Sequence, residues 1–191
     1  MSETRFFTKD VCIDVETLGL GPTAPIVQIG VCWFDLESGP LIDERNMCLS
    51  VNPEHAIKAR AKIDASTLYW WMRQNDAARQ RVFAENSRPL GDALSELSHM
   101  LYGAGEYRVW FHGPHFDEVK LGYHYSLFNQ STPWRYNWVR DSRTLYHAAG
   151  MDWDAVYDEV QKELGGVKHD ALSDARATAQ CISVAWKLLH T

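Results

Sequence analysis

The sequence predicts an α/β fold in which a mixed central sheet of about five strands is flanked by helices. Two observations lead to this prediction. Three strand-like segments follow one another in the first 51 residues, and helix-like and strand-like segments alternate after residue 64. Consecutive strands commonly pair as an antiparallel meander, whereas strands separated by helices commonly pair in parallel. No linker or repeat divides the chain, so residues 1–191 are expected to form one domain.

Each predicted strand is a run of apolar and β-branched residues that ends at turn-forming residues. The strands of the meander are expected at residues 9–16, 26–36 and 45–51, with Gly-Pro at 39–40 as a turn. Two shorter strands are expected at residues 107–111 and 137–140.

The helices are predicted from apolar residues at three- and four-residue spacing. They are expected at residues 64–74, 76–83, 89–103, 115–128, 141–150 and about 170–189. The buried stripes of three of them are expected to be Leu90, Leu94, Leu97 and Leu101; Phe116, Val119, Tyr123 and Leu127; and Leu172, Ala175, Ile182, Ala185 and Leu189.

Composition limits the function classes. The formal net charge of −6 argues against a wide basic surface, so any contact with nucleic acid should be local. No apolar run is long enough to span a membrane, and the first residues have no apolar signal core. The four cysteines are widely separated and are interpreted as small buried residues, without a zinc knuckle or a disulfide framework. We therefore expect a cytoplasmic protein.

Two acids lie close together on the first predicted strand. Asp14 and Glu16 are two positions apart, so a strand directs both side chains to the same face. No lysine or arginine lies between Val11 and Pro25 to neutralise them. Two carboxylates that share a site repel each other unless one is protonated or a cation lies between them.

Three further residues are placed where strands end and helices begin. Asp117 follows the strand 107–111, His169 precedes the last helix, and Asp174 lies in its first turn. In α/β proteins such positions gather at one edge of the sheet. Four converging carboxylates favour two Mg²⁺ or Mn²⁺ ions, about 4 Å apart, which is the arrangement used in phosphodiester cleavage. A nearby histidine could accept the proton of the attacking water.

These residues resemble the motifs of the DEDDh exonucleases, the DnaQ-like 3′→5′ group with a ribonuclease-H-like fold. The resemblance is carried by D14-V-E16-T, F116-D117 and H169-x-x-x-x-D174. A narrower resemblance is to exodeoxyribonuclease-VIII-type enzymes of phages and prophages, a subgroup close to an adenylate-preferring bacterial ribonuclease. It is carried by the stretches AKIDASTLYWWMRQNDAARQ and PWRYNWVRDSRTL, which are similar to sequences of that subgroup. The resemblance extends over about residues 9–187. If the chain is phage-encoded, it would act in the host cytoplasm.

The resemblance implies a role for each motif residue. Two metal ions would be held by Asp14, Glu16, Asp117 and Asp174, and His169 would act as the general base. The reaction would release nucleoside 5′-monophosphates from the 3′ ends of single-stranded DNA or RNA. Thr17, Leu18 and Gly19 would lie against the terminal nucleotide, and Phe116 is a further substrate-binding candidate. The family usually has an asparagine where this chain has His112, which is kept as a substrate-binding candidate.

A cluster of arginines and aromatic residues is the candidate contact for the single strand. Arg140 and Arg143 are interleaved with aromatic residues in the stretch 134–143, a composition that suits a flexible nucleic acid. Trp70 and Trp71 are interpreted as core or subunit-interface residues, which suggests a homodimer through their helix.

Four alternatives remain open from the sequence. The enzyme could act only on RNA tails or overhangs. The His169-Asp170 pair is compatible with an HD-type metal phosphohydrolase, although that fold is helical. The chain could be an inactive nucleic-acid-binding module. His112, His115 and Asp117 could form a zinc cluster, but the spacing is loose and no fourth ligand is evident.

Overall fold

The computed structural model describes residues 9–41 and 44–191. Within these ranges the chain forms a mixed seven-stranded sheet with the order β5-β4-β2-β1-β6-β7, and β3 pairs with β2 beside this path. The strands are β1 (Asp10–Thr17), β2 (Ile26–Asp35), β3 (Gly39–Pro40), β4 (Met47–Asn52), β5 (Arg88–Pro89), β6 (Arg108–Phe111) and β7 (Val139–Asp141). The predicted mixed sheet is therefore confirmed, and its two additional strands, β3 and β5, are two residues long.

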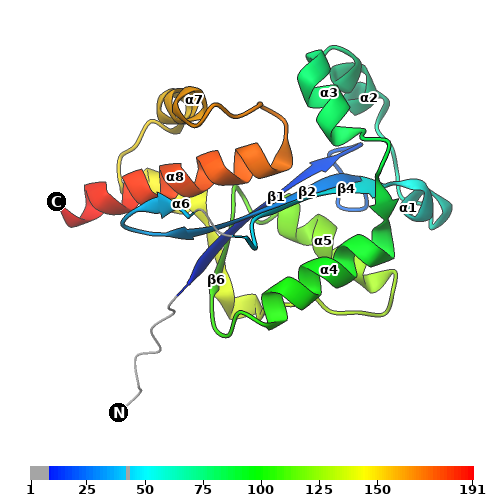
Figure 1. Cartoon of the computed structure of the whole chain (residues 1–191), viewed down its shortest axis with the longest axis horizontal. Coiled ribbons are helices and arrows are strands. Elements are labelled where there is room, and N and C mark those ends of the chain that lie inside the picture. Colours follow the sequence, from blue (N-terminus) through cyan, green and yellow to red (C-terminus); the bar gives the residue numbers. More distant parts are fainter. Residues whose placement is uncertain (1–8, 42–43) are drawn as a thin grey trace.

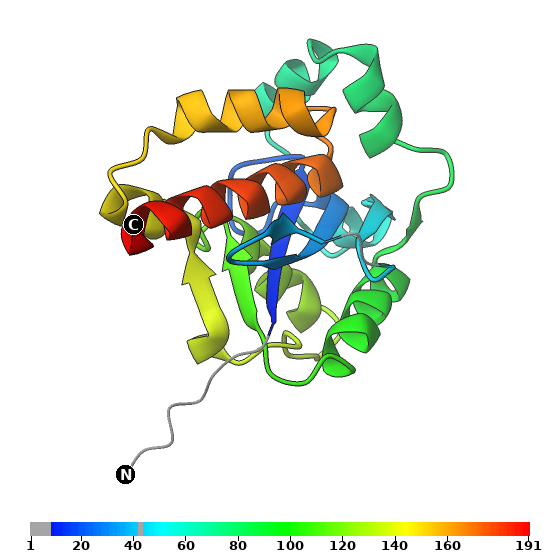
Figure 2. The ribbon, with the colours of Figure 1, turned by 60° about the vertical axis from the view of Figure 1, so that its left-hand side comes forward.

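Helices cover both faces of the sheet (Figure 1). They are α1 (Glu54–Lys58), α2 (Ala65–Met72), α3 (Asp76–Val82), α4 (Leu90–Tyr102), α5 (Asp117–Ser126), α6 (Ser142–Ala148), α7 (Trp153–Leu164) and α8 (Ala171–His190), with a 3₁₀ turn η1 (Tyr136–Trp138). Helices α6, α7 and α8 lie on one face and α4 and α5 on the other, while α2 and α3 lie beyond the end of β1. The turned view separates these layers (Figure 2).

The strand pairing explains how the sheet combines two directions. β1 and β2 are antiparallel, as are β2 and β4, so the predicted meander is confirmed. β6 runs parallel to β1, and β7 runs parallel to β6. The carboxyl ends of β1, β6 and β7 consequently meet at one edge of the sheet, where the loops that follow them can build a site.

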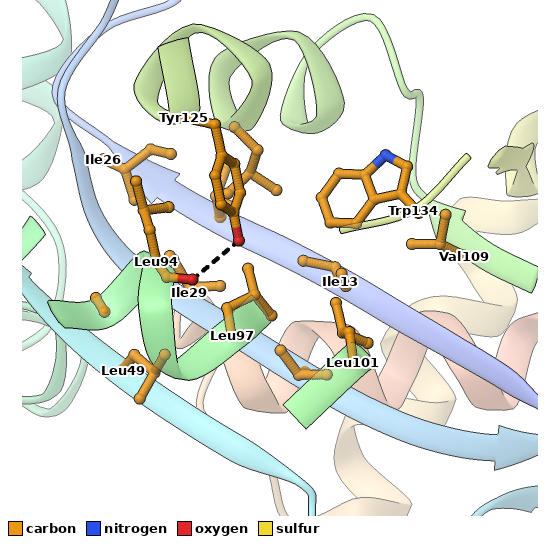
Figure 3. Close-up of a cluster of buried hydrophobic side chains, with 14 of the residues drawn as sticks. Ile13, Ile26, Ile29, Leu49, Leu94, Leu97, Leu101, Val109, Tyr125 and Trp134 are labelled. Carbon is orange, nitrogen blue, oxygen red and sulfur yellow. Dashed lines mark hydrogen bonds between the residues drawn. The ribbon is translucent and has the colours of Figure 1, made fainter. Parts of the chain in front are cut away.

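The larger hydrophobic core lies between the sheet and helices α4 and α5 (Figure 3). The predicted leucine stripe of α4 is confirmed, because Leu90, Leu94, Leu97 and Leu101 are all at most 1% exposed. The Tyr125 hydroxyl donates a hydrogen bond of 3.0 Å to the carbonyl of Leu94 and ties α5 to α4.

Three details differ from the sequence prediction. The 39–40 turn is the short strand β3. The stripe expected on α5 is only half-buried, and the buried face instead carries Lys120, Leu121, His124 and Tyr125. Lys120 can be buried because its ammonium reaches two backbone carbonyls, those of Leu20 and Phe116.

The ends of the chain bring further corrections. Leu189, predicted to face inward, is 43% exposed in the last turn of α8. Cys48 is exposed, whereas Cys12, Cys32 and Cys181 are buried as expected. Helices α1 and α7 were not predicted. The sheet excludes the HD-type alternative, which requires a helical fold. No helix in the described ranges has the length and apolar character needed to cross a membrane.

Candidate active site

The first strand presents two acids on one face of the sheet. Side chains of β1 alternate, so Val11 and Val15 enter the core below α4 and α5, while Cys12 packs in the core below α8. Asp14 and Glu16 lie an even number of residues from Cys12, and their carboxyl groups therefore project on the α8 face.

A glycine allows α8 to begin directly on the sheet. Gly30 of β2 pairs with Asp14 of β1 in antiparallel register. A β-carbon at position 30 would lie 2.1 Å from the carbonyl carbon of Ala171, well inside contact distance. Because glycine has no such atom, the first turn of α8 rests on the strand backbone next to Asp14. That turn contains Asp174, which is thereby brought to the acids of β1.

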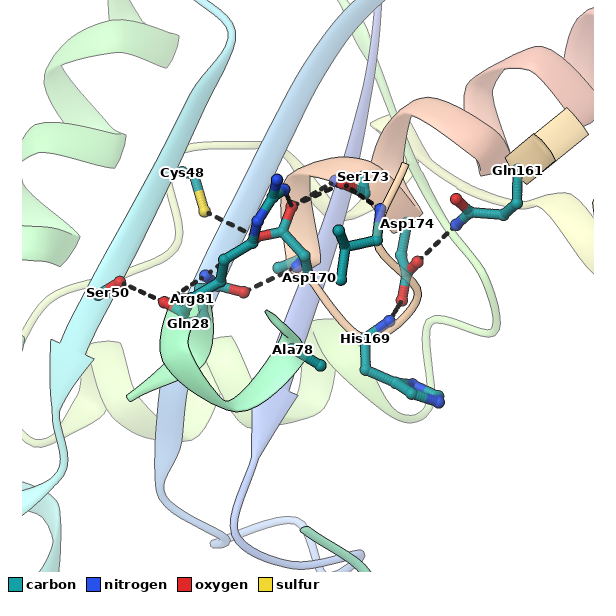
Figure 4. Close-up of polar contacts among 12 residues, drawn as sticks. Gln28, Cys48, Ser50, Ala78, Arg81, Gln161, His169, Asp170, Ser173 and Asp174 are labelled. Atoms are coloured by element: carbon teal, nitrogen blue, oxygen red, sulfur yellow. Dashed lines mark hydrogen bonds and ion pairs between the residues drawn. The ribbon is translucent and has the colours of Figure 1, made fainter. Parts of the chain in front are cut away.

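Three hydrogen bonds hold the carboxylate of Asp174, and Figure 4 shows those from Gln161 and His169. Its Oδ1 accepts from the Tyr157 hydroxyl at 2.8 Å and from Nε2 of Gln161 at 2.7 Å. Its Oδ2 accepts from the backbone N–H of His169 at 3.0 Å. Tyr157 and Gln161 were not predicted to contribute to the site. Both lie on α7, so a helix that the sequence analysis missed supplies the groups that orient a predicted metal ligand.

The loop before α8 carries His169 toward the acids. One ring nitrogen of His169 and one oxygen each of Glu16 and Asp174 lie within 4.8 Å of one another. The His169 backbone has a φ of 67°, in the left-handed region where, apart from glycine, asparagine, aspartate and histidine are enriched. Its ring meets the ring of Trp70 edge to face, with centroids 4.6 Å apart.

The fourth acid comes from the other side of β1. Asp117 is the first residue of α5, shortly after β6, and is 3% exposed. It completes a cavity of about 340 Å³, which we call the acid cavity. The lining residues are Asp14, Val15, Glu16, His112, Phe116, Asp117, Arg143, His169 and Asp174. The structure thus brings together all five residues that the sequence analysis assigned to catalysis.

The electrostatics of the acid cavity are unfavourable for four ionised carboxylates. Burial, followed by the neighbouring carboxylates, raises the pKa of Asp14 and of Glu16 well above ordinary values. Burial also raises the pKa of Asp117 to about 7, and the charges of Lys120 and Arg143 offset only part of this rise. Full ionisation therefore requires positive charge from outside the chain.

The donor set fits a hard divalent cation. Carboxylate oxygens at the end of a strand and the start of a helix, partly oriented by hydrogen bonds, are the ligands that Mg²⁺ and Mn²⁺ prefer. Among the residues that the structure describes, the possible metal-ligating group is Glu16, His169 and Asp174. The zinc cluster considered from the sequence is not formed, since His115 is exposed and His112 stacks on Trp153 with ring centroids 4.2 Å apart.

A second cavity of about 330 Å³ adjoins the acid cavity, and we call it the apolar cavity. Its lining residues are Val15, Glu16, Thr17, Leu20, Ser66, Thr67, Trp70 and Phe116. Thr17 and Phe116, two of the predicted substrate-binding residues, therefore lie in the lining of a cavity next to the acids. The Leu18 side chain differs from the expectation, because it is buried in a small cluster with Val27, Trp71 and Val82. Gly19 lies against Asp64, and Leu20 occupies the rim of the cavity.

The two adjacent tryptophans have different environments. Trp71 is 2% exposed, and its Nε1 donates to the carbonyl of Thr17 at 2.9 Å, which agrees with the predicted core role. Trp70 is 39% exposed and lines the apolar cavity. Its contact with His169 was not predicted. A homodimer through this helix stays a prediction.

The predicted arginine cluster is divided by the fold. Arg143, in the first turn of α6, lines the acid cavity. Arg140, on β7, is not among the residues that line it, and its Nη1 donates to the carbonyls of Asn137 and Val139. Burial, followed by the charge of Arg108, lowers the pKa of Arg140, and the charge of Asp10 opposes this shift. Of the two arginines proposed to bind substrate, the structure therefore brings Arg143 to the site and leaves Arg140 outside it.

Two solved nuclease structures have folds similar to that of this chain. The nuclease domain of 3′hExo, a DEDDh family member bound to rAMP, aligns with a TM-score of 0.62 at 15% identity over 97% of this chain and 93% of that domain. E. coli Exonuclease I in complex with a dT13 oligonucleotide aligns with a TM-score of 0.62 at 14% identity over 92% of this chain. The chain spans about 40% of the length of Exonuclease I. No curated protein sequence matches the chain.

The fold is the ribonuclease-H-like architecture of these nuclease domains, and the converging acids lie together in one cavity at the edge of its sheet. A family model gives the particular assignment. Residues 9–186 match the Rv2179c-like 3′-5′ exoribonuclease domain, and the chain belongs to that family.

Proposed function

We propose that the protein removes nucleoside 5′-monophosphates from single-stranded 3′ ends with two divalent cations, Mg²⁺ or Mn²⁺, and a histidine base. The observation that carries the proposal is the convergence of Asp14, Glu16, Asp117 and Asp174 in one cavity with His169. Bound divalent cations would supply the positive charge that stabilises the attacking and leaving oxygens.

The residues of the chain have separate tasks in this proposal. The four carboxylates hold the cations, and Tyr157 keeps the Asp174 oxygen in place through its hydroxyl. His169 accepts the proton of the attacking water, for which its ring must be neutral. Burial lowers the pKa of His169 below its ordinary value of 6.5, which keeps the free base populated at neutral pH.

RNA is the preferred substrate in this proposal. The family description, a 3′-5′ exoribonuclease domain, supports this choice. The hydroxyl-bearing residues Thr17, Ser66 and Thr67 line the apolar cavity beside Glu16, where a 2′-hydroxyl could find a hydrogen-bond partner. Because similar folds were solved with dT13 and with rAMP, DNA is included as an arm of the test. The phage-type subgroup is part of the proposal as well.

A time course with 5′-labelled oligonucleotides tests the proposal. Single- and double-stranded RNA and DNA are incubated with Mg²⁺, Mn²⁺ or EDTA, and the products are resolved on a sequencing gel. We expect a ladder that shortens from the 3′ end, release of nucleoside 5′-monophosphates, and no activity with EDTA. Degradation from the 5′ end, or undiminished activity with EDTA, would contradict the proposal.

The variant His169→Asn separates turnover from folding. Asparagine tolerates the left-handed backbone of position 169, so the loop should remain intact. We expect turnover to fall by roughly 10² to 10⁴-fold, while calorimetric titration with Mn²⁺ still shows binding. A wild-type protein that neither binds Mn²⁺ nor degrades any of the oligonucleotides would instead favour the inactive nucleic-acid-binding module.

A further inference from the structure

Three cavities lie in a row around the catalytic acids. The acid cavity shares Val15, Glu16 and Phe116 with the apolar cavity. On its other side it shares Asp14, His112, His169 and Asp174 with a smaller cavity of about 190 Å³, the side cavity, which is also lined by Trp153, Tyr157, Lys168 and Thr178. The apolar cavity and the side cavity have no lining residue in common. The acids therefore separate two different environments.

A 3′ exonuclease must place the terminal nucleoside on one side of the scissile phosphate and the remaining strand on the other. The apolar cavity, with Leu20, Trp70 and Phe116 in its lining, suits the base and sugar of the terminal nucleoside. The remaining strand then leaves across the acid cavity toward the side cavity, and the linings of these cavities contain Arg143 and Lys168, respectively. The remaining strand begins with the penultimate nucleoside, and its first charged group is the next phosphodiester, on the 5′ side of that nucleoside.

Arg143 is the cation in the lining of the acid cavity. Its Nε donates to Nε2 of His112 at 3.1 Å. The guanidinium packs over the backbone of Gly113, where a β-carbon would lie 3.3 Å from Cζ and where φ is +88°. In the described parts of the chain, no carboxylate forms an ion pair with Arg143. The terminal nitrogens of a guanidinium held in this way can bind a phosphate through two parallel hydrogen bonds.

His112 fixes the orientation of this arginine. Its ring stacks on Trp153, with centroids 4.2 Å apart and planes at 23°. Nδ1 lies 3.2 Å from the Ser142 hydroxyl oxygen, so a neutral ring can donate there while Nε2 accepts from Arg143. Burial, followed by the charge of Arg143, lowers the pKa of His112 to about 4, which agrees with this neutral tautomer.

We infer that Arg143, with His112 as its positioning residue, binds the phosphodiester immediately 5′ of the scissile one. The inference rests on the proposed exonuclease function and gives a task to the histidine that replaces the usual asparagine. The contact involves the nucleic-acid backbone, so it carries no base preference.

The test combines enzyme variants with a neutral phosphate analogue. Each enzyme is assayed on a single-stranded oligonucleotide with ordinary linkages and on one with a methylphosphonate at the linkage 5′ of the scissile bond. We expect Arg143→Gln to lower kcat/KM on the ordinary substrate by about 10- to 100-fold, the worth of one hydrogen bond to a charged group. Wild type should lose a similar factor on the methylphosphonate, and Arg143→Gln should lose nothing further. The inference would be overturned if Arg143→Gln lost kcat/KM on the methylphosphonate substrate by the same factor as wild type, because the two changes would then act independently.

A substrate without an upstream phosphate separates this inference from the proposed function. The p-nitrophenyl ester of thymidine 5′-monophosphate has a scissile phosphate and no linkage on its 5′ side. A loss with Arg143→Gln on the ester that is much smaller than its loss on the oligonucleotide supports the inference. A loss with Arg143→Gln as large as on the oligonucleotide assigns Arg143 to the scissile phosphate and overturns it. Failure of wild type on every substrate with Mn²⁺ present contradicts the proposed function itself.

Variants of His112 test its positioning role. We expect His112→Leu to behave like Arg143→Gln, because the acceptor for Nε is lost. His112→Asn should recover part of kcat/KM, since its side-chain carbonyl can accept from Arg143. Arg176→Gln, an exposed arginine of α8 outside the cavity lining, is the matched charge control, and melting curves establish that all variants fold. If His112→Leu retained full activity on the ordinary substrate, His112 would have no positioning role.

Discussion

The two ends of β1 carry acids on the same face, but they are neutralised in different ways. At the start of the strand, Asp10 accepts two hydrogen bonds of 2.6 Å from Arg108 and one of 2.6 Å from Nε1 of Trp110. At its end, Asp14 and Glu16 face other carboxylates. The chain completes the first set of contacts itself, whereas the second set requires a ligand. This difference distinguishes an acid that is paired within the fold from the acids that we propose to take part in catalysis.

The largest expected effect comes from removing an acid at the catalytic end. Asp117→Asn should lower turnover by roughly 10³-fold, because one of the charges that hold the cations is lost. The melting temperature of the metal-free protein should stay the same or rise, since the variant removes a repelling carboxylate. Oligonucleotide degradation and thermal melting with EDTA measure the two effects. An active Asp117→Asn enzyme would contradict the assignment.

The matched change at the other end should have the opposite outcome. Asp10→Asn leaves Arg108 without its buried partner and should destabilise the fold by about 3 kcal/mol. Turnover of the folded fraction should be close to that of wild type, because Asp10 does not line the acid cavity. Urea unfolding and activity measured below the transition test this pair of expectations. Unchanged stability would show that the two ends do not differ as described.

The pH dependence of stability provides a smaller effect. Burial raises the folded-state pKa of Asp117 from 3.8 to about 7 and that of Asp174 to about 6. The folded state therefore binds these protons more tightly than the unfolded state. The stability that the protonated Asp117 and Asp174 add to the folded state is fully present below pH 3.8. This stability is lost as the pH rises through 6 and 7.

Melting curves between pH 4 and pH 8 can detect this loss. We expect the melting temperature of the protein in EDTA to fall by several degrees toward pH 8, and Mn²⁺ to reverse the fall. Asp117→Asn is the control, because one of the titrating groups is absent and the fall should be shallower. A fall that Mn²⁺ does not reverse would contradict a cation site at these acids.

The smallest effect concerns Arg140 on β7. Arg140→Gln should change kcat/KM by little, because Arg140 does not line the acid cavity. Arg143→Gln, three positions further along, is the comparison. A loss with Arg140→Gln as large as that with Arg143→Gln would mean that the strand also extends along this part of the surface.

The sequence was sufficient for features that repeat locally. The alternation of β1 placed Asp14 and Glu16 on one face, and the spacing of four leucines gave the buried side of α4. On α5, two stripes were possible, and the buried one contains Lys120, whose burial depends on carbonyls outside its own helix. A single sequence does not show which carbonyls will be within reach.

Other parts of the site depend on contacts between distant segments. Helix α7 was missed although Asp152 caps its start and Gly165 ends it in the left-handed conformation. The tasks of Tyr157 and Gln161 become evident only when Asp174 is placed beside them. In the sequence, Arg140 and Arg143 belong to one run of basic and aromatic residues and appear equally suited to bind substrate. In the structure, Arg140 lies on β7 and Arg143 lies beyond the end of that strand, in the lining of the acid cavity.

Gly30 has a consequence for how variants of this protein should be interpreted. The residue has no functional group, yet α8 can reach Asp14 only because position 30 lacks a β-carbon. Even alanine there would push the start of the helix outward and carry Asp174 away from its partners. A screen for inactive mutants should therefore recover position 30 together with the acids, and a lost cation affinity in such a mutant would report a displaced helix instead of a missing ligand.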